Sequence, residues 1–244
     1  MVKTTNILSI PVAQVTRAEI LQTITKHLKT SDEQLFIVTA NPEIIMLTKE
    51  QAAYKNAVLQ ADFVLPDGIG VIVGAKMLNE PLPEKIPGYE LVHDLLALSS
   101  KEGFSVFFYG AKEGIAEQAA RNAQELYNGL QIAGVMDGYQ FQGEDAAKRI
   151  EETNPHIIFV AMGAPRQEQW IATYKERFPN AVLIGVGGSF DVLSGTVKRA
   201  PKFWTNNNLE WLYRLLTQPT RAKRMLKIPK FLVAVLKERM VGRK

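Results

Sequence analysis

The 244-residue sequence contains no cysteine, which excludes disulfide bonds and thiolate metal sites. Its only histidines, His27, His93 and His156, are scattered and match no metal-ligand spacing. No apolar run approaches the roughly 18–20 residues that span a bilayer. The first residues also lack the long apolar segment of a secretory signal. We therefore expect a cytoplasmic protein.

Three familiar glycine motifs are also missing. The segment GVGGSF departs from the dinucleotide-binding pattern GxGxxG, because Phe190 stands where the third glycine belongs. Asp191 follows too closely to be the ribose-binding acid expected about 20 residues further on. Neither a Walker A sequence nor the nucleophile elbow GxSxG occurs. A nicotinamide dehydrogenase is therefore disfavoured.

Charge is divided unevenly along the chain. Residues 198–244 contain 13 Lys or Arg and two acidic residues, a net charge of +11, whereas residues 1–197 carry −7. This asymmetry suggests that the C-terminal segment meets an anionic partner such as a membrane surface, phosphates or nucleic acid. The alternative is a solvated helical face, but the basic residues are interleaved with Trp, Leu, Phe and Val.

Apolar strands alternate with amphipathic helices over most of the chain, which indicates a parallel sheet covered by helices on both faces. Pro11 assigns a strand over 6–12 to the sheet edge, and Thr16 with Glu19 forms a capping box. Further strands are predicted over 34–39, 63–68, 105–110, 131–138, 157–163 and 181–188. Helices are predicted over 17–29, 43–60, 89–100, 113–128, 143–153 and 166–177. The expected core is Rossmann-like and spans residues 1–195.

After Pro201 the pattern changes to helices separated by prolines, predicted over 206–217, 220–227 and 229–240. These form a small basic helical appendage over 196–244. The apolar stretch of the last helix is too short to cross a membrane, but with its flanking Lys and Arg it suits an interfacial helix. The alternative is that these helices pack against the core or against a second subunit.

Two loops at the predicted carboxyl rim of the sheet hold candidate chemistry. Asp67 follows a short strand and suits a general base that deprotonates a hydroxyl; alternatively it caps the next helix. In GAPRQE, Gly163 permits the turn and the helix start attracts anions. Arg166 and Gln167 add donors for a phosphate or sugar, unless this is an ordinary helix start with a surface arginine. In 183–201, Gly187 and Gly188 let a ligand approach the backbone closely.

Several of these segments together resemble the WecG/TagA/CpsF family of bacterial glycosyltransferases over nearly the whole chain. They are TAN (39–41), PDG (66–68), PLPEKIPGYEL (81–91), FFYGA (107–111), GAPRQEQW (163–170), GVGGSFDVLSGTVKRAP (185–201) and LEWLYRLLTQPTRAKRM (209–225). The likeness is strongest to the TagA branch. That branch transfers N-acetylmannosamine from UDP to undecaprenyl-diphosphate-linked N-acetylglucosamine, which begins the wall teichoic acid linkage unit.

The resemblance implies an inverting transfer that needs neither metal nor cofactor. Asp67 matches the family's proposed base, which activates the 4-hydroxyl of the acceptor sugar. The other matches are the polar pocket residues Thr39, Asn41 and Gln167, the nucleotide side Gly187, Gly188 and Asp191, and the tail arginines Arg214, Arg221 and Arg224 over the lipid diphosphate. The resemblance also implies peripheral association with the inner face of the cell membrane.

Two departures from the family pattern bear on the site. Lys85 replaces the usual Arg and keeps its charge, but loses the bidentate fork that steadies a departing diphosphate. Glu90 replaces the more usual Asp. Other readings stay open: a relative with another UDP-sugar donor for capsule or common antigen, or a non-catalytic basic membrane or nucleic-acid module. The aromatic-poor rim disfavours nucleic acid, and self-association through the apolar tail is a further hypothesis.

Overall fold

The fold is built on one eight-stranded sheet in a computed structural model that describes residues 2–217 and 225–242. The strand order is β1-β2-β4-β3-β8-β7-β5-β6. β1 pairs antiparallel with β2, and the other neighbouring strands pair in parallel. The bounds are β1 (Thr4–Ile7), β2 (Ile10–Ala13), β3 (Leu35–Ala40), β4 (Phe63–Pro66), β5 (Ser105–Gly110), β6 (Gln131–Met136), β7 (Ile157–Ala161) and β8 (Val182–Gly185). The predicted parallel sheet is confirmed.

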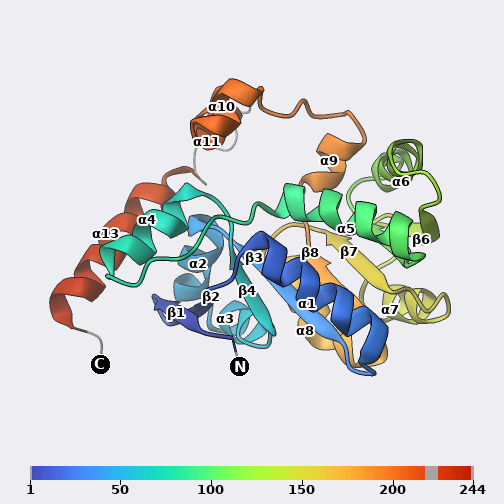
Figure 1. Cartoon of the computed structure of the whole chain (residues 1–244), viewed down its shortest axis with the longest axis horizontal. Helices are drawn as coiled ribbons and strands as arrows, with labels where there is room; N and C mark the ends of the chain where they lie inside the picture. Colours follow the sequence, from blue (N-terminus) through green and yellow to red (C-terminus); the bar gives the residue numbers. More distant parts are fainter. Residues whose placement is uncertain (1, 218–224, 243–244) are drawn as a thin grey trace.

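Helices cover both faces of this sheet and bury a separate hydrophobic cluster on each (Figure 1). On one face lie α1 (Arg17–Thr30), α5 (Gly88–Glu102), α6 (Ile115–Leu126) and α9 (Ser189–Leu193). On the other lie α2 (Pro42–Glu50), α3 (Ala52–Val58), α4 (Ile69–Met77), α7 (Gly143–Glu151) and α8 (Arg166–Tyr174), which runs into the 3₁₀ turn η1 (Lys175–Arg177). Every side chain of β3 and β7 is buried, as expected for parallel strands covered on both sides.

Two local predictions were wrong. The edge strand expected over 6–12 is a hairpin, because the chain turns at Leu8 and Ser9, which adopt φ values of 50° and 68°. The single helix expected over 43–60 is two helices, broken at Gln51, whose backbone is extended. The capping box is confirmed: Thr16 accepts from the Glu19 amide, and the Glu19 carboxylate accepts from the Thr16 amide.

The C-terminal segment forms α10 (Lys202–Asn206), α11 (Glu210–Thr217) and α13 (Lys227–Val241). Most of the helix predicted over 220–227 lies outside the described residues. α13 packs against α2 and α4, and Phe231 and Val235 are fully buried there. Gly74 permits this contact, since a Cβ at that position would lie 2.8 Å from the Phe231 ring. The division of the chain at residue 195 stays a prediction, although α13 shares the core of the preceding part.

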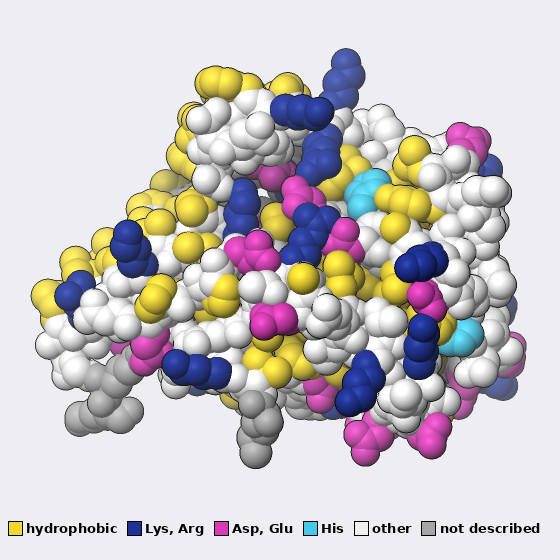
Figure 2. Space-filling model, in the orientation of Figure 1, with side chains coloured by type: hydrophobic (Ala, Val, Ile, Leu, Met, Phe, Trp, Pro, Cys, Tyr) yellow, Lys and Arg dark blue, Asp and Glu magenta, His cyan; other side chains and the backbone are white. Residues whose placement is uncertain are grey.

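α10, α11 and α13 also carry hydrophobic side chains that are exposed to solvent. Hydrophobic side chains gather along the edge of the molecule formed by α10, α11 and α13 (Figure 2). The exposed ones are Phe203, Trp211, Leu216, Leu226, Val233, Leu236, Met240 and Val241. Within the described residues, no helix combines the length and the hydropathy needed to traverse a bilayer.

Replacing Phe231 with alanine tests the packing of α13. We expect the free energy of unfolding to fall by about 3–5 kcal/mol, because a fully buried ring is lost and a cavity remains. Phe203 is 67% exposed, so Phe203→Ala is the matched control and should change the value by less than about 0.5 kcal/mol. Urea denaturation measures both, and equal effects of the two substitutions would contradict the burial of Phe231.

Candidate active site

Asp67 lies at the carboxyl end of β4, where open α/β sheets bind ligands. Its backbone amide donates to the Ala40 carbonyl at 2.9 Å, which holds the loop against β3. Gly68 follows with φ +89°, so the chain turns immediately into α4. No side chain of the described residues caps the start of that helix. The half-buried carboxyl group of Asp67 is therefore not engaged as a helix cap.

Charged groups from distant parts of the chain act on this carboxyl group. The pKa of Asp67 is raised to about 6: burial and the carboxylate of Glu210 raise it, and Arg214, the Gly88 amide and Lys85 lower it in part. The balance leaves Asp67 ionised at neutral pH but with an unusually basic carboxylate. A pKa near the working pH is what an efficient general base requires.

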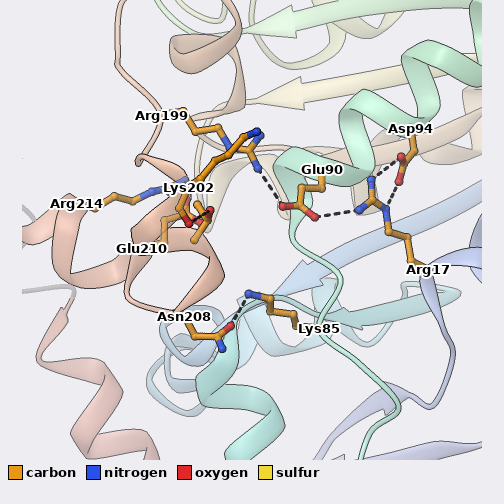
Figure 3. A network of polar contacts seen from close by, with 10 residues as sticks. Arg17, Lys85, Glu90, Asp94, Arg199, Lys202, Asn208, Glu210 and Arg214 are labelled. Atoms are coloured by element: carbon orange, nitrogen blue, oxygen red, sulfur yellow. Dashed lines mark hydrogen bonds and ion pairs between the residues drawn. The ribbon is translucent and has the colours of Figure 1, made fainter.

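The cations of this site come from two separate segments and are held by the appendage (Figure 3). Lys85 lies in the loop before α5, and its ammonium donates to Oδ1 of Asn208 at 2.5 Å. Arg214 on α11 forms an ion pair with Glu210, one helical turn earlier. The structure therefore places Lys85 and Arg214 where both act on the charge of Asp67. Arg221 and Arg224 lie outside the described residues.

The sequence did not predict that Asn208 and Glu210 would belong to this site. Asn208 joins α10 to α11 with φ +58°, a conformation that Asn tolerates better than most residues. Glu210 is one of only two acidic residues in the segment 198–244, which was the one available signal. Neither residue lies near Asp67 in the sequence, so their role became visible only when the fold placed α11 over the rim.

Thr39 and Asn41, at the end of β3, are close to the same rim but contribute differently. Thr39 is buried, and its hydroxyl packs on the first residue of α5: a Cβ on Gly88 would lie 2.8 Å from Oγ1. Asn41 is the N-cap of α2, with its Oδ1 accepting from the Ile44 amide at 3.0 Å. Both residues therefore shape the rim beside Asp67.

Gln167 joins the loops that follow β7 and β8. Its Oε1 accepts from the Gly163 amide at 2.9 Å and from the Gly187 amide at 3.0 Å. Gly163 and Gly187 have positive φ, and a Cβ on either would meet nothing within 4 Å. Both loops thus present bare backbone to open space. The predicted polar pocket residue therefore organises the predicted glycine loops.

The other predicted donor-side residues are spread around these loops. Gly188 is exposed and precedes α9, in which Asp191 is half-buried. Arg166 is exposed and turns back to donate to the Met162 carbonyl at 3.0 Å. No three His, Asp or Glu side chains among the described residues are grouped to hold a metal ion.

An ion-pair network, also absent from the sequence predictions, ties the appendage to α5 (Figure 3). Glu90 accepts from Arg199 and from Arg17, each at 3.0 Å, and Arg17 also pairs with Asp94. The Arg199 guanidinium lies 4.8 Å from the ring centroid of Tyr89, a cation–π contact. This network holds the segment just before α10 against α5. The first residue of α5 is Gly88, whose backbone amide interacts with Asp67.

Comparisons with known proteins identify similar sequences. The sequence profile of the glycosyl transferase WecG/TagA/CpsF family matches residues 5–244. The chain is 43% identical over 228 residues to an N-acetylglucosaminyldiphosphoundecaprenol N-acetyl-beta-D-mannosaminyltransferase of Bacillus spizizenii, covering 92% of this chain and 89% of that one. It is 40% identical to the Bacillus subtilis protein of the same name, with 97% and 92% covered. A Staphylococcus aureus protein of that name is 38% identical, with 85% and 82% covered.

The charges around Asp67 predict how its carboxyl group titrates. In ¹³C NMR, we expect its signal to titrate near pH 6, ionised above and protonated below. Glu210→Gln should lower this pKa, because a like charge is removed, whereas Arg214→Met should raise it, because an opposite charge is removed. The resonance is assigned by its loss in Asp67→Asn. Shifts of the opposite sign, or none, would contradict the arrangement of α11 over Asp67.

Proposed function

The chain belongs to the WecG/TagA/CpsF family of glycosyltransferases, and we propose that it transfers N-acetylmannosamine from UDP to N-acetylglucosamine on undecaprenyl diphosphate. The acceptor is the sugar's 4-hydroxyl, the anomeric centre is inverted, and the product begins the wall teichoic acid linkage unit. The names of relatives at 38–43% identity support this donor sugar and this lipid acceptor.

The observation that carries the proposal is a basic carboxylate beside two cations. Asp67 takes the proton from the acceptor hydroxyl, whose oxygen forms the new bond to the anomeric carbon as the bond to the UDP oxygen breaks. Negative charge then develops on the departing diphosphate, which cations and donors stabilise most when they are already in place. Lys85 supplies such charge at the rim, and Arg214, which also acts on Asp67, is proposed to hold the diphosphate of the lipid acceptor.

We assign the binding of the UDP-sugar donor to the loops after β7 and β8, which Gln167 joins. The backbone of Gly163, Gly187 and Gly188 is open to close approach, which suits the diphosphate and ribose of a nucleotide. Asp191 and Arg166 flank these loops and are proposed to contact the rest of UDP. Thr39 and Asn41, between the two regions, are proposed to line the sugar pocket.

The basic appendage is proposed to meet the inner face of the cytoplasmic membrane. Its support is the net charge of +11 over residues 198–244 together with the exposed apolar side chains of α10, α11 and α13 (Figure 2). This combination suits an anionic bilayer surface. Such a surface would deliver the lipid-linked acceptor to Lys85 and Arg214. Self-association through the same apolar face, when no membrane is present, remains a hypothesis.

Asp67→Asn tests the base. Turnover should fall about 10²–10⁴-fold, the usual contribution of a general base, while the Kd for UDP measured by calorimetry stays unchanged. Thermal stability at neutral pH should not fall. The pKa of Asp67 is raised from the ordinary value of 3.8 to about 6 in the folded protein. Above pH 6 the carboxylate is therefore ionised in the folded state at a cost in stability, and an uncharged asparagine avoids this cost. Unaltered turnover would reject Asp67 as the base.

A panel of UDP-sugars tests the donor. Purified protein is incubated with a polyprenyl-diphosphate N-acetylglucosamine acceptor in detergent, and UDP release is followed for UDP-N-acetylmannosamine, its C2 epimer UDP-N-acetylglucosamine, UDP-glucose and UDP-glucuronic acid. We expect release with UDP-N-acetylmannosamine and only when the acceptor is present. A different preferred donor would leave the family assignment intact and replace the proposed sugar.

A further inference from the structure

Two polar side chains are buried next to each other at the start of α8, behind the donor-side loops. Gln167 is 3% exposed and Glu168 is 1% exposed. Nε2 of Gln167 donates to Oε1 of Glu168 at 2.7 Å. Gly185 leaves room for this pair, since a Cβ there would lie 2.5 Å from Nε2 of Gln167. The close approach of β8 to α8 therefore depends on the absence of a side chain at Gly185.

Three hydrogen bonds fix the orientation of the Gln167 amide, and Glu168 accepts the one from its NH₂ side. On one side of the amide stand two donors, the backbone N–H groups of Gly163 and Gly187; on the other stands a carboxyl oxygen. If the amide were reversed, its NH₂ group would face two N–H donors and its carbonyl would face an acceptor. An unsatisfied buried polar group costs about 1–3 kcal/mol. Only the observed orientation satisfies all three hydrogen bonds.

Glu168 itself is an expensive group to bury. Glu168 interacts with the hydroxyl of Tyr54, a fully buried α3 residue, but among the described residues neither its Oε2 nor that hydroxyl makes a hydrogen bond of normal geometry. Burial raises the pKa of Glu168 to about 7. An apolar side chain at this position would avoid that cost, but it would leave Nε2 of Gln167 without an acceptor.

We propose that Glu168 is a positioning residue for donor binding: it holds Gln167 in the one orientation that fastens the loops after β7 and β8 together. The loops then present the Gly163 and Gly187 backbone as one fixed surface to the diphosphate of the nucleotide. The identity of that ligand rests on the proposed function, whereas the fastening of the loops does not.

Glu168→Met tests the proposal, because methionine has a similar length and no strong acceptor. Amide hydrogen exchange, read by mass spectrometry, should become faster in peptides containing Gly163 and Gly187. The Kd for UDP should rise at least about tenfold, and the melting temperature should change little, because leaving Nε2 of Gln167 unpaired offsets the gain from removing a buried carboxyl group. Glu125 is exposed on α6, so Glu125→Met is the matched control and should change none of the three.

Two more variants separate positioning from simple packing. Glu168→Gln keeps an acceptor for Nε2 of Gln167 and should restore loop protection and UDP affinity. In a Gln167→Met background, Glu168→Met should produce no further loss, because Glu168 acts only through Gln167. If Glu168→Met does not fold, a Glu168→Gln variant with weakened UDP binding would overturn the proposal.

Unchanged exchange at Gly163 and Gly187 in folded Glu168→Met would also overturn it, as would loss of melting temperature and UDP affinity together. Failure of the wild-type protein to bind UDP would reject the proposed function instead. The exchange measurement would still decide whether Glu168 fastens the two loops.

Discussion

A carboxyl group held partly away from water, between opposing charges, is the constraint on which the rest of this structure depends. Asp67 is disfavoured as an anion by burial and by Glu210, and it is kept ionised at neutral pH by Arg214, Lys85 and the Gly88 amide. Such a carboxylate is basic because its surroundings stabilise the charge only in part. These groups come from α5, the loop before it and α11, so the scaffold must place these three parts of the chain around one point.

The contacts that hold these elements in place differ in strength. β3, β4 and α5 are fastened by a buried sheet and by the close contact between Thr39 and Gly88. The part of the appendage over the rim, α10 and α11 with the segment before them, is held by partly exposed contacts instead, such as Arg199 with Glu90 and Lys85 with Asn208. Exposed ion pairs contribute at most about 1 kcal/mol each. The base is therefore rigidly mounted, whereas the cation on α11 is held by several weak interactions.

The two sides of α13 have different surroundings. α13 places Phe231 and Val235 in the core beside α2 and α4, and Glu238 accepts from the Leu8 amide of the β1–β2 hairpin at 3.1 Å. Its other side leaves Val233, Leu236 and other apolar side chains open. One side of α13 thus contributes to the hydrophobic core, and its other side presents an exposed apolar surface.

The sequence by itself determined the alternating strands and helices, the capping box at Thr16 and the rim position of Asp67 and Gln167, because these depend on local periodicity and on the geometry of parallel sheets. The hairpin turn at Leu8 and the break at Gln51 were missed, since neither residue type marks a turn. Tertiary structure alone decided that Glu210 and Asn208 meet the rim, that Arg199 pairs with Glu90 and that Gln167 bridges two loops. The hydrogen bonds of Lys85 with Asn208, Arg199 with Glu90 and Gly187 with Gln167 join residues 123, 109 and 20 positions apart, and no local pattern specifies such pairing. Only the packing of the whole chain brings them together.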